Sequence, residues 1–287
     1  MSEPDLCAPP LPVTAQPKHA LPTGACDCHF HIFDGPSVQV TNRSYTAPPA
    51  SLAAYRQVQE TLGVQRSVIV QPSVYGADNR TTVEVCKSDP HMRAVVVVDE
   101  HVSDQELRGF AEVGVVGCRV NMLFSSGVNS GTLEQLARRI ADFDWHIQIL
   151  ADISQLEGLK DVAARLPVPV MFDHMGHMPA DFGVSHPAFQ QFLRLLADGR
   201  IWVKLSGAYR VTTRQGRIYD DVGDIVSALV SANPDHLVWG SDWPHPQIPV
   251  PMPDDTDLLN QLFDWIPNKT HQQTIFVNNP ASFYGFS

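Results

Sequence analysis

Residues 93–98 read Arg-Ala-Val-Val-Val-Val, a short run that is mostly β-branched. An almost unbroken apolar run of this kind is typical of a strand that is buried on both faces, as in a parallel sheet. Seven further short apolar runs are spaced along the chain, and each of them ends in polar residues. The eight runs cover residues 25–33, 67–73, 93–98, 116–122, 146–150, 168–175, 201–207 and 237–242.

The segments between these runs are long enough to form helices. Residues 133–143 and 189–196 place apolar side chains at helical spacing, which is typical of amphipathic helices. Alternation of strand and helix predicts a parallel sheet, and eight such units close a barrel. We therefore predict an α/β protein, a (β/α)8 TIM barrel in a single domain over residues 24–287, preceded by an irregular N-terminal segment over residues 1–23. An open doubly wound sheet is the alternative, but no Gly-rich dinucleotide-binding motif follows an early run.

The composition narrows the class of partner. A formal net charge of −11 argues against nucleic acid and anionic membranes, because both require a basic face, whereas a few local arginines can still attract a small anion. No apolar run approaches the roughly 20 residues of a membrane-spanning helix. The five cysteines are odd in number and lack zinc-ribbon spacing, which favours a reduced, cytoplasmic protein. The oligomeric state stays open.

Polar residues gather at the ends of the first and eighth runs. Residues two apart on a strand share a face, so Asp27, His29 and His31 are expected to point together. Two histidines at the end of a first barrel strand are candidates for metal binding or oxyanion stabilisation, and a structural role is the alternative. Asp242 ends the eighth run, which is a costly place for a carboxylate unless it is paired or functional. A helix cap or turn is the alternative for this residue.

The sixth run adds Asp173 and His174 at its end. Asp173 is suited to accept the second N–H of a histidine and so to orient its ring. Three histidines at the ends of the first and sixth runs, together with Asp242, indicate a catalytic cluster. The irregular residues 34–50 and 243–255 follow the first and eighth runs, and they are expected at the same mouth of the barrel, where functional loops gather.

Three motifs together resemble the amidohydrolase superfamily: the His-Phe-His of residues 29–31, the Asp-His-Met-Gly of residues 173–176, and the Trp-Gly-Ser-Asp-Trp-Pro-His-Pro of residues 239–246. The branch that they resemble is that of the 2-pyrone-4,6-dicarboxylate lactonase-like amidohydrolases, which includes sugar-acid lactonases and lactone isomerases. The resemblance extends from about Gly24 to the Asn-Asn-Pro-Ala-Ser-Phe-Tyr of residues 278–284.

The resemblance implies that His29, His31 and His174 polarise a lactone carbonyl and that Asp242 activates water. Ester hydrolysis needs both functions. Metal-dependent members carry a bridging ligand on the fourth strand and a histidine on the fifth, whereas here the fourth run offers no such ligand and His146 stands at the wrong end of the fifth. We therefore expect no binuclear site and no required metal. A single zinc held by His29, His31, His174 and Asp242 is the open alternative.

Arginine binds carboxylates with a planar fork, and two arginines interrupt apolar strand ends. Arg119 and Arg210 match positions that bind substrate carboxylates in the pyrone lactonases, although a surface ion pair is the alternative for Arg210. Other positions expected to be basic or tyrosine read Phe-Ser-Ser at residues 124–126, His177 and Leu150, which favours a sugar-acid lactone with one carboxylate. The expected substrate-binding residues are Arg119, Arg210, Ser73, Tyr75, Asn121, Tyr209, His177 and His245.

The sequence thus favours a lactonase, a carboxylic ester hydrolase acting on a small anionic lactone. A lactone isomerase, such as a galactarolactone isomerase, is the nearest alternative, because Asp242 can also transfer a proton between substrate hydroxyls. A mononuclear zinc amidohydrolase is the second alternative, and a non-catalytic barrel that binds sugar acids is the third. Neither the particular lactone nor the choice between hydrolysis and isomerisation follows from the sequence.

Overall fold

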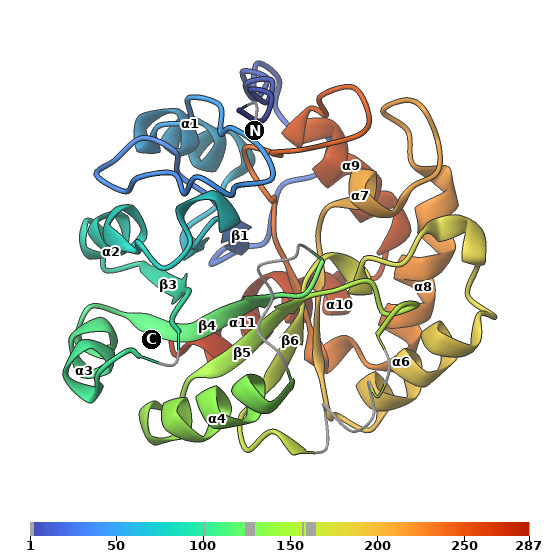
Figure 1. The fold of residues 1–287 in the computed structure, drawn as a ribbon. Coiled ribbons are helices and arrows are strands. Elements are labelled where there is room, and N and C mark those ends of the chain that lie inside the picture. Colours follow the sequence, from blue (N-terminus) through green and yellow to red (C-terminus); the bar gives the residue numbers. More distant parts are fainter. Residues whose placement is uncertain (1–2, 100, 124–129, 157, 159–164, 287) are drawn as a thin grey trace.

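The computed structural model describes residues 3–99, 101–123, 130–156, 158 and 165–286 (Figure 1). Its centre is one eight-stranded parallel sheet in which each strand pairs with the next along the chain. Every predicted run overlaps one strand, so the predicted barrel is confirmed. The strands are β1 Cys26–Phe30, β2 Arg66–Val70, β3 Met92–Val96, β4 Val115–Asn121, β5 His146–Leu150, β6 Val170–Phe172, β7 Trp202–Leu205 and β8 Leu237–Trp239.

Helices lie around the strands, with the apolar faces of the amphipathic ones turned to the sheet (Figure 1). The helix predicted over residues 133–143 overlaps α4 and continues into η2, and the helix predicted over residues 189–196 lies within α6. The α-helices are α1 Leu52–Leu62, α2 Arg80–Lys87, α3 Asp104–Glu112, α4 Ser130–Ile140, α6 Pro187–Ala197, α7 Ala208–Val211, α8 Gly223–Ala232, α9 Asp255–Trp265, α10 Lys269–Gln273 and α11 Asn279–Tyr284. The short helical segments that are not α-helices are η1 Ser73–Tyr75, η2 Ala141–Phe143, η3 His174–Gly176, η4 Ala180–Phe182, η5 Asp220–Val222, η6 Pro234–His236 and η7 Thr274–Asn278.

The barrel closes just beyond the end of β8. The amide of Asp242 donates to the carbonyl of His29 (2.7 Å), and the amide of His31 donates to the carbonyl of Trp243 (2.8 Å). These two bonds join the end of β1 to the residues after β8. The closure therefore brings together the polar motifs at the ends of the first and eighth runs.

The strands bury side chains on both faces, as the apolar runs predict. One face packs against the helices in a large core. The other face fills the inside of the barrel, where residues near the C-terminus of the chain join the layer. This second layer contains Cys26, Cys28, Val68, Val70, Val95, Met171, Val238, Tyr284 and Phe286.

Strand β1 departs from simple alternation, because its pairing with β2 shifts register between Asp27 and Phe30. Such an irregularity places two successive side chains on one face. Asp27 consequently turns toward α1 and accepts a hydrogen bond from the hydroxyl of Tyr55 (2.9 Å). His29 and His31 do converge, with 3.3 Å between their Nε2 atoms. The expectation that Asp27 points with the two histidines is wrong for this reason.

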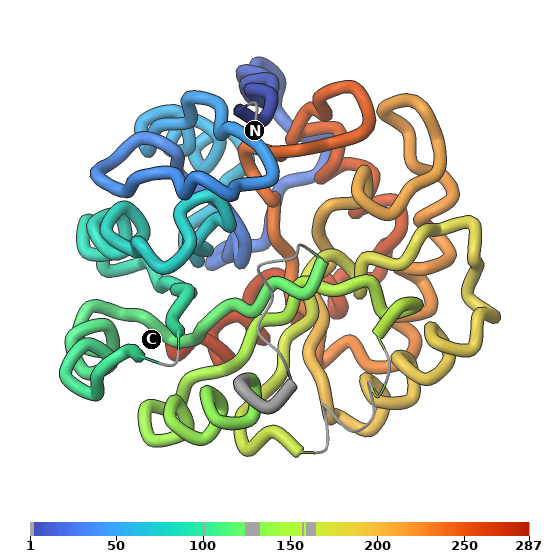
Figure 2. The backbone as a smooth tube through the Cα atoms, viewed as in Figure 1, coloured from blue at the N-terminus to red at the C-terminus, as the bar shows by residue number. Residues whose placement is uncertain are grey.

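The N-terminal segment runs beside α9 (Figure 2). The hydroxyl of Thr256 donates to the carbonyl of Ala15 (3.0 Å), and the amide of Lys18 donates to Asn260 Oδ1 (2.8 Å). The boundary placed at residue 24 stays a prediction. Within the described ranges, no helix combines the length and the apolar character needed to cross a membrane.

Candidate functional site

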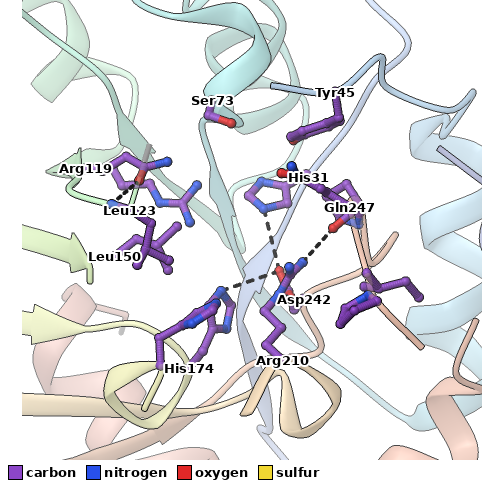
Figure 3. A pocket seen from close by; sticks show the side chains of 15 residues that line it. His31, Tyr45, Ser73, Arg119, Leu123, Leu150, His174, Arg210, Asp242 and Gln247 are labelled. Atoms are coloured by element: carbon purple, nitrogen blue, oxygen red, sulfur yellow. Dashed lines mark hydrogen bonds and ion pairs between the residues drawn. The ribbon is translucent and has the colours of Figure 1, made fainter. Parts of the chain in front are cut away.

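A cavity of about 590 Å³ lies among residues that end or follow the strands (Figure 3). The carboxyl ends of the strands are where TIM barrels carry their active sites. Eight of the twelve residues singled out in the sequence line this cavity. They are His31, Ser73, Arg119, Asn121, His174, His177, Arg210 and Asp242.

The other four lie outside the cavity wall. His29 is fully buried, directly against His31. Tyr209 and His245 are also fully buried, and they lie behind Asp242. Tyr75 packs its ring near that of Phe33 instead (centroids 6.1 Å apart). The structure therefore gives Tyr75, Tyr209 and His245 contacts with the protein at the places where the sequence suggested contacts with substrate.

Three histidine Nε2 atoms converge on one carboxylate oxygen, Asp242 Oδ1. The distances are 3.6 Å from His29, 3.7 Å from His31 and 3.9 Å from His174. Figure 3 shows His31 directed at Asp242 from above and His174 directed at it from the left. Asp242 Oδ1 is buried and has no hydrogen-bond partner in the part of the chain that the structure describes. A buried oxygen of this kind requires a proton donor or a cation.

The backbone of the cluster is strained. Asp242 has φ +62° and His174 has φ +48°, in the left-handed region that residues with side chains rarely adopt. The bond from Asp242 N to His29 O and the bond from His245 N to Asp242 O (2.8 Å) hold this turn in place. Strain of this kind costs roughly 1–3 kcal/mol per residue and gathers at functional sites.

Burial sets the protonation of the cluster. It lowers the pKa of His29 to about 4, and it holds the pKa of His31 and His174 well below the usual histidine value. Burial alone would raise the pKa of Asp242, but the guanidinium of Arg210 and the nearby histidines hold that pKa well below its usual value. The cluster at neutral pH therefore consists of neutral imidazoles around an ionised carboxylate.

The hydrogen bond behind the His31 ring assigns its tautomer. His31 Nδ1 lies 2.7 Å from the carbonyl of Val70, which can only accept, so Nδ1 carries the proton. Nε2 of the neutral His31 ring is then an acceptor, and it faces the acceptor Asp242 Oδ1. His29 Nδ1 lies 3.3 Å from Asp173 Oδ1 and 3.4 Å from Lys204 Nζ, so this ring can donate to the carboxylate or accept from the ammonium group. The expectation that the histidines polarise the lactone carbonyl stays a prediction.

A single divalent cation fits this set of acceptors. Tetrahedral zinc with bonds of about 2.0–2.1 Å separates its ligand atoms by about 3.4 Å. The Nε2 atoms of His29 and His31 are 3.3 Å apart, and both lie in the group with Asp242 whose ligand atoms are close enough to hold an ion. His174 Nε2 approaches the same carboxylate oxygen. The four residues named as the alternative zinc ligands are thus brought together.

The second oxygen of Asp242 is fully engaged. Arg210 Nε donates to Oδ2 (2.5 Å), and the hydroxyl of Tyr209 donates to the same atom (2.6 Å). Arg210 Nη2 also donates to the carbonyl of Pro246 (3.0 Å). Arg210 therefore reaches the cavity, as predicted, but with its charge already paired to the carboxylate.

A second buried carboxylate, Asp173, organises the floor of the site. Arg119 Nε and Gln148 Nε2 donate to its Oδ2 (3.2 and 3.1 Å), and Arg119 Nη2 forms an ion pair with the same oxygen (3.2 Å). Lys204 Nζ lies 3.6 Å from Oδ1, beside His29 Nδ1. Burial alone would raise the pKa of Asp173, but His29, Lys204 and Arg119 hold it well below its usual value. The predicted orienting role of Asp173 thus concerns His29.

The sequence analysis missed Lys204. Its ammonium group is fully buried and donates to the carbonyl of Cys28 (2.9 Å) and to Gln148 Oε1 (2.7 Å). Burial lowers its pKa below the usual lysine value. A lysine inside the apolar Trp202–Leu205 run was the available signal, because an unpaired charge in a buried strand is very costly.

We expect Lys204→Met to destabilise the fold by about 3 kcal/mol, since it leaves Asp173 with one cation fewer in a buried site. Urea denaturation measures the loss, with exposed Lys87→Met as the matched control, expected to stay within about 0.5 kcal/mol. A Lys204→Met protein as stable as the wild type would show that Arg119 alone compensates Asp173.

The loops predicted to form the mouth do so. Tyr45, from residues 34–50, lines the cavity and hydrogen bonds to Ser73, and residues 246–249 line the side that follows Asp242. Leu123 and Leu150 add an apolar wall. Tyr45 and residues 246–249 were not singled out individually, although the segments that contain them were. The Phe-Ser-Ser at residues 124–126 falls outside the described residues.

The fold and the site define a barrel with a buried carboxylate and three histidines at the carboxyl ends of its strands. Residues 26–286 match the family model described as amidohydrolase, and the chain belongs to this family. The branch suggested by the motifs is confirmed by the curated relatives of the chain.

Three of these relatives act on lactones by name. The chain is 35% identical to a 4-sulfomuconolactone hydrolase of Rhizobium radiobacter, over 97% of this chain and 96% of the relative. It is 34% identical to a 2-pyrone-4,6-dicarboxylate hydrolase of Comamonas testosteroni, over 94% and 93%. It is 26% identical to a D-galactarolactone isomerase of Agrobacterium fabrum, over 94% of each.

A solved structure shares the fold closely. The crystal structure of Agrobacterium tumefaciens ATU3138, in its apo form, superposes with a TM-score of 0.85. Its sequence is 26% identical, and the match covers 94% of this chain and 99% of that one. The likeness supports the TIM-barrel architecture over the whole described barrel.

Proposed function

We propose that the protein is a carboxylic ester hydrolase that opens a small lactone carrying a negatively charged group. The observation that carries this proposal is Asp242 Oδ1, a buried and ionised acceptor that faces a cavity among three histidines. A carboxylate in that position suits a general base for water. The relatives named as hydrolases of pyrone dicarboxylate and sulfomuconolactone support the reaction class.

In this proposal Asp242 Oδ1 accepts a proton from water as the water oxygen bonds to the lactone carbonyl carbon. The ring C–O bond then breaks, and the same proton passes from Asp242 to the leaving ring oxygen, so that lactone and water yield one hydroxy acid. Arg210 and Tyr209 hold Oδ2, which leaves Oδ1 free for this exchange. Burial of the cluster excludes bulk water from it.

The residues that would hold a single divalent cation are His29, His31, His174 and Asp242. A cation bound there supplies charge that stabilises the developing oxyanion and lowers the pKa of water. The acceptor tautomer of His31 supports its inclusion in the proposal. Metal-independent hydrolysis, expected from the sequence, then requires His29 or His174 to donate through Nε2.

We expect exhaustive chelation to abolish turnover and added zinc to restore it, because the cluster brings four potential metal ligands together. Metal analysis before and after chelation, with turnover measured on each sample, tests this. His91, which is exposed and does not belong to the cluster, provides a matched control: His91→Ala should bind as much metal as the wild type, and His31→Ala should bind less. Full activity in metal-free protein would show that the histidines polarise the lactone carbonyl without a metal.

The charges and walls of the cavity support an anionic lactone. Among the described residues, Arg119, Arg210 and Lys204 form ion pairs with Asp173 and Asp242, which leaves one positive charge in excess among these five groups when the histidines are neutral. The apolar wall that includes Leu123 and Leu150 suits a ring with one apolar edge better than a fully hydroxylated sugar-acid lactone. The screen therefore covers unsaturated lactones with one acidic group as well as the lactones of sugar-acid catabolism.

A screen of aldono-, aldaro- and pyrone-lactones with a pH indicator tests hydrolysis. In ¹⁸O-water, hydrolysis places label in the product carboxylate, whereas an isomerase yields unlabelled lactone. Isomerisation is the second candidate, because Asp242 can move a proton between hydroxyls and one relative is named as a lactone isomerase. Binding without turnover across the screen would support the non-catalytic alternative.

A reducing, cytoplasmic location completes the proposal. All five cysteines are unpaired in the structure, and four of them are buried. Free buried cysteines suit a compartment in which thiols stay reduced.

A further inference from the structure

A second group of polar side chains lies on the buried side of Asp242, away from the cavity. Tyr209, His245 and Asp255 lie there in a continuous row of polar contacts that the reaction scheme above does not need for substrate. All three side chains are buried, and Tyr209 and His245 are completely so. Buried polar groups that do not touch the cavity need another reason for their place.

The contacts of the row are short and sequential. The Tyr209 hydroxyl lies 2.6 Å from Asp242 Oδ2 and 2.8 Å from His245 Nδ1. His245 Nε2 lies 3.3 Å from Asp255 Oδ1. Neither of these last two atoms has a hydrogen-bond partner among the described residues, so their only close charged contact is with each other.

The direction of the bonds follows from the single proton of Tyr209. That proton is directed at the carboxylate of Asp242, which can only accept. The Tyr209 oxygen is then free to accept from His245 Nδ1, and Nε2 on the opposite side of the ring faces Asp255 Oδ1 at 3.3 Å. The ring therefore lies between Tyr209 and Asp255, which limits its orientation.

The far end of the row rests on a rigid element. Asp255 is the first residue of α9, and the preceding Asp254 caps that helix by accepting from the amides of Thr256 and Asp257. The backbone of His245 is tied to Asp242 itself, through the bond from its amide to the Asp242 carbonyl. The row therefore links the catalytic turn after β8 to the start of α9.

We propose that Asp255, His245 and Tyr209 are positioning residues that, with Arg210, fix Asp242 Oδ2 so that only Oδ1 faces the histidines. Two donors on one carboxylate oxygen prevent the carboxylate from rotating about its Cβ–Cγ bond. Arg210 alone leaves that rotation possible, because one charged contact can follow the oxygen as it moves. This inference rests on the proposed function, in which Oδ1 acts as the base.

The test compares Tyr209→Phe with Tyr219→Phe. Tyr219 is a matched control, because it is also fully buried and its hydroxyl has no hydrogen-bond partner within the described ranges. We expect Tyr209→Phe to lower kcat about 10- to 100-fold, the range typical of residues that orient a catalytic group, with KM unchanged within about twofold. We expect Tyr219→Phe to leave both constants as in the wild type.

Variants of Asp255 distinguish a role in orienting His245 from a role of the side chain in filling space. We expect Asp255→Ala to lower kcat about tenfold and Asp255→Asn, which keeps a polar group of the same shape beside His245 Nε2, to recover most of that loss. Both should leave KM unchanged. Equal losses in the Ala and Asn variants would overturn the positioning role of Asp255.

Crystal structures supply a readout that does not depend on activity. The Asp242 carboxylate should be rotated in Tyr209→Phe and unchanged in Tyr219→Phe. An unmoved carboxylate, or a raised KM with normal kcat, would overturn the proposal, and the raised KM would point to substrate binding by Tyr209. If the wild type turns over no lactone, the proposed function fails while the crystal structures still decide the role of the row.

Discussion

Asp242→Asn is expected to lower kcat by at least about 10³-fold, the largest single effect at this site. The amide that replaces the carboxylate cannot take a proton from water. The groups that surround Oδ1 are three histidines. Steady-state turnover of the best lactone from the screen measures the loss. Retention of more than a tenth of wild-type activity would show that the base has been misassigned.

Folding must be measured beside turnover, because Asp242→Asn also removes the counter-charge of Arg210. Breaking a buried pair in this way costs about 3–5 kcal/mol. The double variant Asp242→Asn/Arg210→Met removes both charges and should recover stability without recovering turnover. Exposed Asp198→Asn is the matched control, expected to change neither property. Recovery of activity in the double variant would attribute the loss to folding.

The barrel could be predicted because parallel strands that are buried on both faces consist of short, almost continuous apolar runs. Each run overlaps a strand, and the polar residues at the ends of the first, sixth and eighth runs meet where β1 joins the residues after β8. What period-two alternation could not show is the register shift in β1. That shift separates Asp27 from His29, and no feature of the sequence around Cys28 indicates it.

The direction of the side chains beyond the strand ends could not be predicted from the sequence either. Tyr209 and His245 follow strands seven and eight closely, as residues of a substrate pocket do, yet both point behind Asp242. The position of His245 depends on the turn at Asp242, whose φ of +62° cannot be read from the sequence, since a glycine would be the usual signal. Lys204, in contrast, carried a readable signal, because a charge within an apolar strand requires a buried partner.

Arg119 is expected to recognise the acidic group of the substrate, so Arg119→Met should lower kcat/KM by about 2–4 kcal/mol, with Arg119→Lys in between. The contacts of Arg119 are compatible with a role in binding substrate and with a role in holding Asp173. Arg119 lines the cavity and has one guanidinium nitrogen, Nη1, whose closest protein acceptor is the carbonyl of Gln71 at 3.5 Å. Its Nε and Nη2 are already bound to Asp173.

Substrate charge separates the two roles of Arg119. If Nη1 binds the acidic group, the Arg119→Met change should impair a carboxylated lactone and leave its uncharged analogue, a poor substrate of the wild type, nearly unaffected. If Arg119 serves only to hold Asp173, both lactones should lose activity equally, because His29 would lose its fixed partner in either case. Exposed Arg194→Met controls for the loss of positive charge from the protein as a whole, and it should change neither substrate. Equal losses for both lactones would therefore contradict the proposal that the substrate carries an acidic group. They would not contradict the proposal that Asp242 supports the hydrolysis of a lactone.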